Sequence, residues 1–249
     1  MLRKLAHIIV WIGVFAYLAM ALAFTERMEK TQTVENIEVE IVDSSEIQFV
    51  DSDDVIAKLR SHGFRISGIL IDSINRSAIS EVVNDITGVK DGRVFYTPDS
   101  DLHIRIWQCR PLLRIKSGGQ DYYLDEDSNV LQFSSKYSPR VIVMTGNIGL
   151  EMARNRLFGL AMFISEDLFF SSLIQEIHIN SKQFLEIIPR IGNHRIFMGE
   201  ADNYEWKLSK LKAFYEKVIP NLGWERYSSI DLRYGDQVVC KKIDSNSIN

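Results

Sequence analysis

Residues 102–116 read LHIRIWQCRPLLRIK. In the first half of this stretch apolar and polar side chains alternate, which is the pattern of a β-strand with one buried face. Pro111 then interrupts the pattern, because proline has no N–H to donate to a neighbouring strand. A second strand-like run, residues 113–116, follows directly. The stretch therefore predicts two β-containing units in succession, with the boundary at Pro111.

The unit before this boundary, residues 36–111, has the predicted element order β-α-α-β-β. Its first strand is predicted over residues 37–41, where apolar and acidic residues alternate. Two amphipathic helices follow, beginning at residues 52–54 and 75–77, whose side chains favour helix N-termini, and a glycine follows each helix. The last two predicted strands are residues 89–96 and 102–107. This α+β order, two helices on a three-stranded sheet, is that of the POTRA module.

The unit after the boundary, residues 112–244, is predicted to be richer in strands, and residues 245–249 are a tail. Strand-like runs separated by turn residues occupy residues 113–116, 120–124, 130–133, 141–144, 174–180, 184–188, 195–199, 227–234 and 237–243. Helices are predicted from Leu150, from Ser165 and over residues 208–218, the last with its lysines on the outward face. The pattern predicts an antiparallel β-sheet domain backed by helices.

Residues 5–24, LAHIIVWIGVFAYLAMALAF, are the longest apolar run of the chain. A helix of this length covers about 30 Å, the thickness of the hydrocarbon core of a bilayer. Arg3 and Lys4 precede the run, whereas acidic and basic residues balance each other after it, which favours a cytoplasmic N-terminus. We therefore predict a cytoplasmic tail (1–4), a single transmembrane helix (5–24) and a linker (25–35).

A cleaved signal peptide is the alternative interpretation of the apolar run. Residues 21–23, Ala-Leu-Ala, resemble a small-residue cleavage site. A signal peptide, however, has an apolar core of about 7–15 residues and then a polar stretch before the cleavage site. Because the apolar run continues to Phe24, a retained anchor is favoured.

Composition and motifs argue against a nucleic-acid-binding protein and against an enzyme. The formal net charge is −4, whereas proteins that bind nucleic acid carry an excess of Lys and Arg on their binding face. The sequence has no H-E-x-x-H, no G-x-S-x-G, no phosphate-binding loop and no dinucleotide fingerprint. We therefore predict no catalytic residues, no cofactor and no metal site.

Asp125, Asp127 and Asn129 copy the opening of a calcium-binding loop. The glycine that should follow is Val130, and the closing glutamate position holds Lys136. The segment is therefore predicted to be a hairpin turn, with Asn129 as the residue that tolerates a positive φ.

The two cysteines, Cys109 and Cys240, belong to no C-x-x-C pair. Outside the cytoplasm they are candidates for a disulfide, which the sequence alone does not decide.

The last predicted strand contains residues 237–242, Gln-Val-Val-Cys-Lys-Lys. A terminal strand often lies at the edge of its sheet, where a partner strand can pair with its unsatisfied N–H and C=O groups. Lysines also protect sheet edges against unwanted pairing. An ordinary protected edge strand is therefore the alternative to a binding site.

The segments QCRPLLR (108–114), DYYLD (121–125) and SIDLRYGDQVVCKK (229–242) follow one another along the chain. Together with the predicted span, POTRA-type module and β domain, they resemble the FtsQ/DivIB family of single-span bacterial division proteins over nearly the whole chain. The forms PRIG (189–192) and QVVC (237–240) are similar to the version found in Bacteroidota.

This resemblance implies a non-enzymatic divisome scaffold in the inner membrane, with a cytoplasmic N-terminus and a periplasmic C-terminal region, at the septum. Family members join FtsB and FtsL, two small single-span proteins, and the complex controls septal peptidoglycan synthesis by the FtsW–FtsI pair. In the family, the FtsB-like partner adds a strand beside the terminal strand. Carried over to this chain, the partner-binding residues are Arg233, Tyr234, Gln237, Val238, Val239, Cys240, Lys241 and Lys242.

Two other classes of function are alternatives to a division scaffold. A POTRA-bearing periplasmic chaperone or assembly factor would be expected to carry repeated POTRA segments. An anchored periplasmic hydrolase would need a catalytic constellation. The sequence contains neither pattern.

Overall fold

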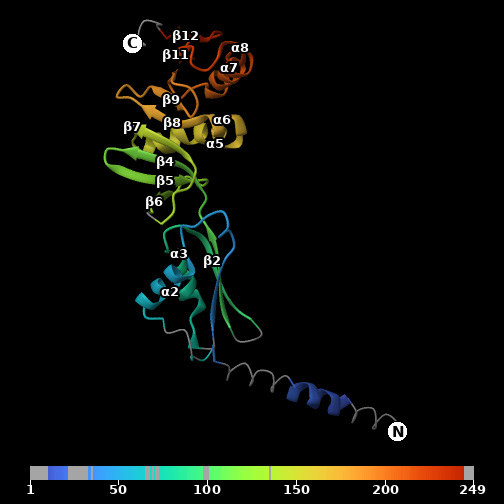
Figure 1. Cartoon of the computed structure of the whole chain (residues 1–249). Helices are drawn as coiled ribbons and strands as arrows, with labels where there is room; N and C mark the ends of the chain where they lie inside the picture. Colours follow the sequence, from blue (N-terminus) through green and yellow to red (C-terminus); the bar gives the residue numbers. More distant parts are fainter. Residues whose placement is uncertain are drawn as a thin grey trace. The chain divides into compact units, whose positions relative to one another are not determined.

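The computed structural model describes residues 11–21, 33–34, 36–64, 68, 70, 73–97, 101–134 and 136–243. The chain divides into two compact units, Met1–Gln108 and Cys109–Asn249. Figure 1 shows the course of the chain through both units.

Residues 11–21 are helical with exposed side chains. Among the described residues, no helix is both long and apolar enough to cross a bilayer. Residues 5–10 and 22–24 of the predicted span lie outside the described residues, as do the predicted tails and most of the predicted linker.

The first unit contains a three-stranded sheet in the order β1-β3-β2. Its strands are β1 (Ile37–Ile41), β2 (Val89–Tyr96) and β3 (Leu102–Gln108), and its helices are α2 (Ser52–Ser61) and α3 (Arg76–Asn84). Strand β3 pairs in parallel with β1 and antiparallel with β2. Helix α2 packs near β1 and α3 packs against β2. The predicted two-helix, three-stranded α+β module is thereby confirmed.

Local sequence explains where these helices begin. Asp51 precedes α2, and its side chain accepts a hydrogen bond from the N–H of Asp54 at 2.8 Å, while the Asp54 side chain accepts one from the N–H of Asp51 at 3.3 Å. Asn75 caps α3 by accepting the N–H of Ala78 at 3.1 Å. Such caps satisfy backbone donors that the first helical turn leaves without a partner.

The second unit contains a nine-stranded sheet in the order β12-β11-β10-β9-β8-β7-β4-β5-β6. Its strands are β4 (Pro111–Ser117), β5 (Gln120–Asp125), β6 (Val130–Gln132), β7 (Ile142–Gly146), β8 (Ile174–Ile179), β9 (Leu185–Pro189), β10 (Arg195–Gly199), β11 (Tyr227–Asp231) and β12 (Val239–Lys242). Pro111 is the first residue of β4, a position in a strand that proline tolerates.

The prediction of an antiparallel sheet is wrong for this unit, because the sheet is mixed. Strand β7 pairs in parallel with both β4 and β8, and β10 pairs in parallel with β11. Parallel neighbours need a long crossover connection, and here helical segments connect β7 to β8 and β10 to β11. The prediction that helices back the sheet holds, and Figure 1 shows α5, α6 and α7 on the same side of it.

The helices of this unit differ in detail from those predicted. The first crossover consists of α4 (Leu150–Met152), a π-helical turn (Ala153–Leu157), α5 (Phe158–Glu166) and α6 (Leu168–Leu173). The second consists of α7 (Tyr204–Lys217) and α8 (Ile219–Leu222). Thus Pro220, expected only to stop a helix, lies near the start of a short second one.

The turn between β5 and β6 is a hairpin turn, as predicted. The carboxylate of Asp125 accepts hydrogen bonds from the N–H groups of Asp127 at 3.0 Å and Asn129 at 2.7 Å. The residue with positive φ, however, is Ser128 at 64°, not Asn129. The buried Asp125 carboxylate holds this turn together.

The core of the second unit lies between the helices and the sheet. It includes the fully buried Ile115, Met144 and Ile177 from the strands and Leu208 and Leu211 from α7. Cys240 carries a thiol, so no disulfide joins it to Cys109.

We expect Gly146→Ala to destabilise the second unit. Gly146 ends β7 with φ +105°, and a Cβ there would lie 2.0 Å from the carbonyl oxygen of Ile179 in β8. Backbone strain of this kind costs about 2 kcal/mol or more in the free energy of unfolding. Urea unfolding of the full-length chain measures this loss. Gly149→Ala is the matched control, because Gly149 has φ −85° and no atom within 4 Å of the added carbon. Equal stability of the two variants would contradict this prediction.

We also expect the free energy of unfolding of the second unit to fall as the pH falls below about 6.5. The group responsible is His194, which is buried and contacts the hydroxyl of Tyr215. Burial lowers the pKa of His194 in the folded chain. Below the ordinary histidine pKa the unfolded chain therefore binds a proton that the folded chain does not, and folding loses up to about 1.4 kcal/mol per pH unit.

Urea unfolding at pH 7.5 and 5.5 measures this effect. The decrease in stability should be smaller in His194→Gln than in the wild type. The same decrease in wild type and His194→Gln would show that another group is responsible.

Candidate functional site

Strand β12 lies at one end of the nine-stranded sheet and pairs with β11 on one side. The pairing is antiparallel and places Cys240 opposite Ile230 and Val239 opposite Asp231. A bulge lies in β11, between Tyr227 and Ser229, so β12 itself is regular. The structure therefore places the predicted terminal strand at a sheet edge.

Two hydrogen bonds show which way the backbone of this strand faces. Ile243, directly after β12, donates its N–H to the carbonyl of Arg226 at 3.1 Å. The carbonyl of Lys241 accepts the hydroxyl of Ser228 at 3.2 Å. The backbone groups of residues 241 and 243 thus face β11.

Backbone groups of consecutive residues in an antiparallel strand face opposite sides. Val239 therefore faces β11 as well, whereas the N–H and C=O of Cys240 and Lys242 face away from it. In the part of the chain that the structure describes, no further strand lies on that side. This row of backbone groups, which we call the open edge, can accept an added strand.

The side chains of the edge differ between its two faces. Val238 and Cys240 pack against the hydrophobic core, and burial raises the pKa of the Cys240 thiol. Val239 is 41% exposed, and Lys241 and Lys242 are exposed. Val239 and Lys241 thus lie on the exposed face of the edge, and Lys242 is the exposed side chain on the face of Val238 and Cys240.

The segment 232–238 joins β11 to β12, and Asp231 orders its beginning. The Asp231 carboxylate accepts the N–H of Arg233 at 3.0 Å and its guanidinium at 2.5–3.1 Å. The Arg233 guanidinium thereby lowers the pKa of the Asp231 carboxyl. The Arg233 side chain lies over the Phe197 ring and beside Gly199, where a Cβ would approach it to 2.9 Å.

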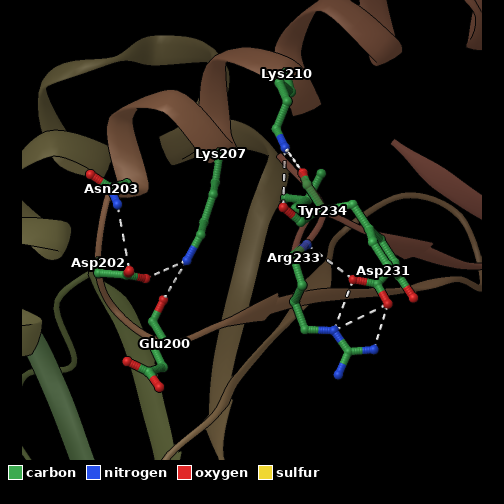
Figure 2. Close-up of polar contacts among 9 residues, drawn as sticks. Glu200, Asp202, Asn203, Lys207, Lys210, Asp231, Arg233 and Tyr234 are labelled. Atoms are coloured by element: carbon green, nitrogen blue, oxygen red, sulfur yellow. Dashed lines mark hydrogen bonds and ion pairs between the residues drawn. The ribbon is translucent and has the colours of Figure 1, made fainter. Parts of the chain in front are cut away.

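Lys210, on α7, orders the same segment from the other side (Figure 2). Its ammonium donates to the carbonyls of Leu232 at 3.2 Å, Tyr234 at 2.5 Å and Gly235 at 2.7 Å. The indole N–H of Trp206 also donates to the Gly235 carbonyl, at 3.3 Å. We call Lys210 and Trp206 the loop anchor. Sequence reasoning missed it, because a lysine on the outward face of a helix ordinarily points into solvent.

Two other lysines of α7 bind different segments. Lys207 donates to the carbonyl of Glu200 at 3.0 Å and the carboxylate of Asp202 at 2.5 Å (Figure 2), and this contact lowers the pKa of Asp202. Lys212 pairs with Asp167 at 2.9 Å. The lysine face of α7 is thus largely engaged in contacts with the protein.

The predicted site residues fall into two neighbouring groups. Val239, Cys240, Lys241 and Lys242 form β12. Strands were predicted over 227–234 and 237–243, but β11 ends at Asp231 and β12 begins at Val239, so that prediction is wrong for the joining segment, which contains Arg233, Tyr234, Gln237 and Val238. Tyr234 is 48% exposed. The structure therefore brings all eight together at one end of the sheet.

No group of His, Cys, Asp and Glu side chains is arranged to hold a metal ion within the described ranges.

Two family models match the chain. Residues 32–107 match the POTRA-like domain, and residues 110–241 match the family described as FtsQ/DivIB, C-terminal related. No curated protein matches the chain. The second match spans most of the nine-stranded sheet, including nearly all of β12. The chain belongs to the FtsQ/DivIB-related family of cell-division proteins and carries a POTRA-like module.

Proposed function

We propose that this protein is a non-enzymatic scaffold of the division machinery that binds FtsB- and FtsL-like single-span proteins. Family membership supports the division role, since the FtsQ/DivIB family is generally one of division scaffolds. The open edge of β12 supports the mode of binding. Through this complex the protein would help control septal peptidoglycan synthesis by the FtsW–FtsI pair.

The proposed topology is that of a protein anchored once in the inner membrane. Residues 5–24 would span the bilayer with residues 1–4 in the cytoplasm. The two domains, residues 36–111 and 112–244, would lie in the periplasm at the septum. The support is the apolar run itself and the membrane-associated character of the family.

Strand addition at β12 is the proposed recognition step. The outward N–H and C=O groups of Cys240 and Lys242 would pair with an extended segment of the FtsB-like partner. Main-chain hydrogen bonds supply affinity in this mode, and alternate side chains supply specificity. Here Val239, Lys241 and Lys242 are the exposed side chains that such a segment would meet. Arg233 and Tyr234 are proposed to contact the partner beside the strand.

Cys240→Pro tests the open edge. The change removes an N–H that faces away from β11, so we expect the chain to stay folded, since edge strands tolerate proline on their outward side. We expect capture of the FtsB-like partner from detergent-extracted membranes to fall at least about tenfold, because a central hydrogen bond of the added strand is lost.

Two further variants complete this experiment. Cys240→Ala removes the thiol but keeps the N–H, so it should capture the partner as the wild type does. Val239→Pro removes an N–H that faces β11 and should lower the stability of the fold itself. If Cys240→Pro captures as much partner as Cys240→Ala, the open edge is not the binding site.

A further inference from the structure

The joining segment 232–238 has a concentrated set of backbone acceptors. The carbonyls of Leu232, Tyr234 and Gly235 all receive hydrogen bonds from the Lys210 ammonium. An ammonium has three N–H donors, so these carbonyls use its whole donor capacity. Burial lowers the pKa of Lys210, consistent with an ammonium that has exchanged water for protein acceptors. The Lys210 ammonium is therefore bound by backbone carbonyls of the protein and is not an ordinary surface lysine surrounded by solvent.

The segment is held between charges of opposite sign. Asp231 accepts the N–H and guanidinium of Arg233, while Lys210 donates to the carbonyls on either side of that residue. Figure 2 shows Lys210 directed at Tyr234 and Arg233 folded back onto Asp231. Together these contacts fix the course of the chain from the last residue of β11 toward β12.

We propose that Lys210 is a positioning residue for partner binding: through the joining segment it orders β12 and holds the open edge ready to receive a strand. This inference rests on the proposed function. Strand addition is weaker when the receiving strand must first be ordered, because ordering costs conformational entropy. Strand β12 has four residues and, among the described residues, pairs with β11 alone, so the segment that leads into it helps to hold it in place.

The physical reason for a lysine here is the geometry of its donors. Three carbonyls converge on one point, which suits a compact ammonium with rotatable donors. An arginine would present a planar fork of donors in place of that point charge. Methionine keeps the unbranched length of the side chain but donates no hydrogen bond.

Lys210→Met in the full-length chain is the test, and Lys207→Met is its matched control. Both changes replace a lysine of α7 that binds a backbone carbonyl, but the Lys207 contact holds the segment between β10 and α7. We expect hydrogen exchange of the amides in residues 239–243 that face β11, those of Val239, Lys241 and Ile243, to become about tenfold faster in Lys210→Met than in the wild type, since hydrogen bonds to a charged group are lost. Exchange in the central strands β8 and β9 should not change. In Lys207→Met, exchange in residues 239–243 should stay at the wild-type rate.

The second measurement is capture of the co-expressed FtsB-like partner. We expect Lys210→Met to capture several-fold less partner than Lys207→Met. Unchanged exchange in residues 239–243, or faster exchange with undiminished capture, would overturn the role of Lys210 and leave the proposed function intact. A wild-type chain that captures no partner would instead refute the proposed function, and with it the inference.

If Lys210→Met does not fold, Trp206→Phe takes its place. That change removes the indole hydrogen bond to Gly235 and keeps an aromatic ring at a side chain that is 56% exposed. Faster exchange in residues 239–243 together with weaker capture supports the inference, and wild-type values in both measurements contradict it.

Discussion

The ladder of hydrogen bonds between β11 and β12 is the interaction on which the candidate site depends. It uses the backbone groups of alternate residues, Val239, Lys241 and Ile243, and so leaves those of Cys240 and Lys242 directed outward. If the pairing slipped by one residue, the backbone groups that now face β11 would face outward, and the buried side chains of the strand would become exposed. The packing of Val238 and Cys240 on the core opposes such a slip, because it fixes which side chains are buried.

Much of the fold could be predicted from local sequence. Alternation predicted β1 and β3 with nearly their observed bounds, and capping residues located the starts of α2 and α3. These features depend on interactions between residues close together in the chain. The edge position of β12 was also expected, from its place as the last strand.

What the sequence did not reveal depends on contacts between distant segments. Whether β7 pairs with its neighbours in parallel is decided by how the helical crossover packs, and strand periodicity carries no information on direction. The same holds for Lys210, whose ammonium meets carbonyls more than twenty residues away in the chain. In the turn between β5 and β6, the preference of asparagine for positive φ pointed to Asn129, but the residue with positive φ is Ser128. The Asp125 carboxylate, which binds the N–H of Asn129, sets the course of this turn.

The mixed pairing of the nine-stranded sheet has a consequence for the order in which the molecule assembles. Strands β7 and β8, and β10 and β11, pair only after the helical crossovers between them have been closed, which makes the contact order high and folding slow. Strands β11 and β12 form an antiparallel pair joined by residues 232–238, and Val238 and Cys240 pack on the core of the complete sheet, so this pair gains its tertiary support only when β11 is seated beside β10. In a chain that has not completed its sheet the edge would lack this support, so recognition by the proposed strand addition would also favour mature copies of the protein.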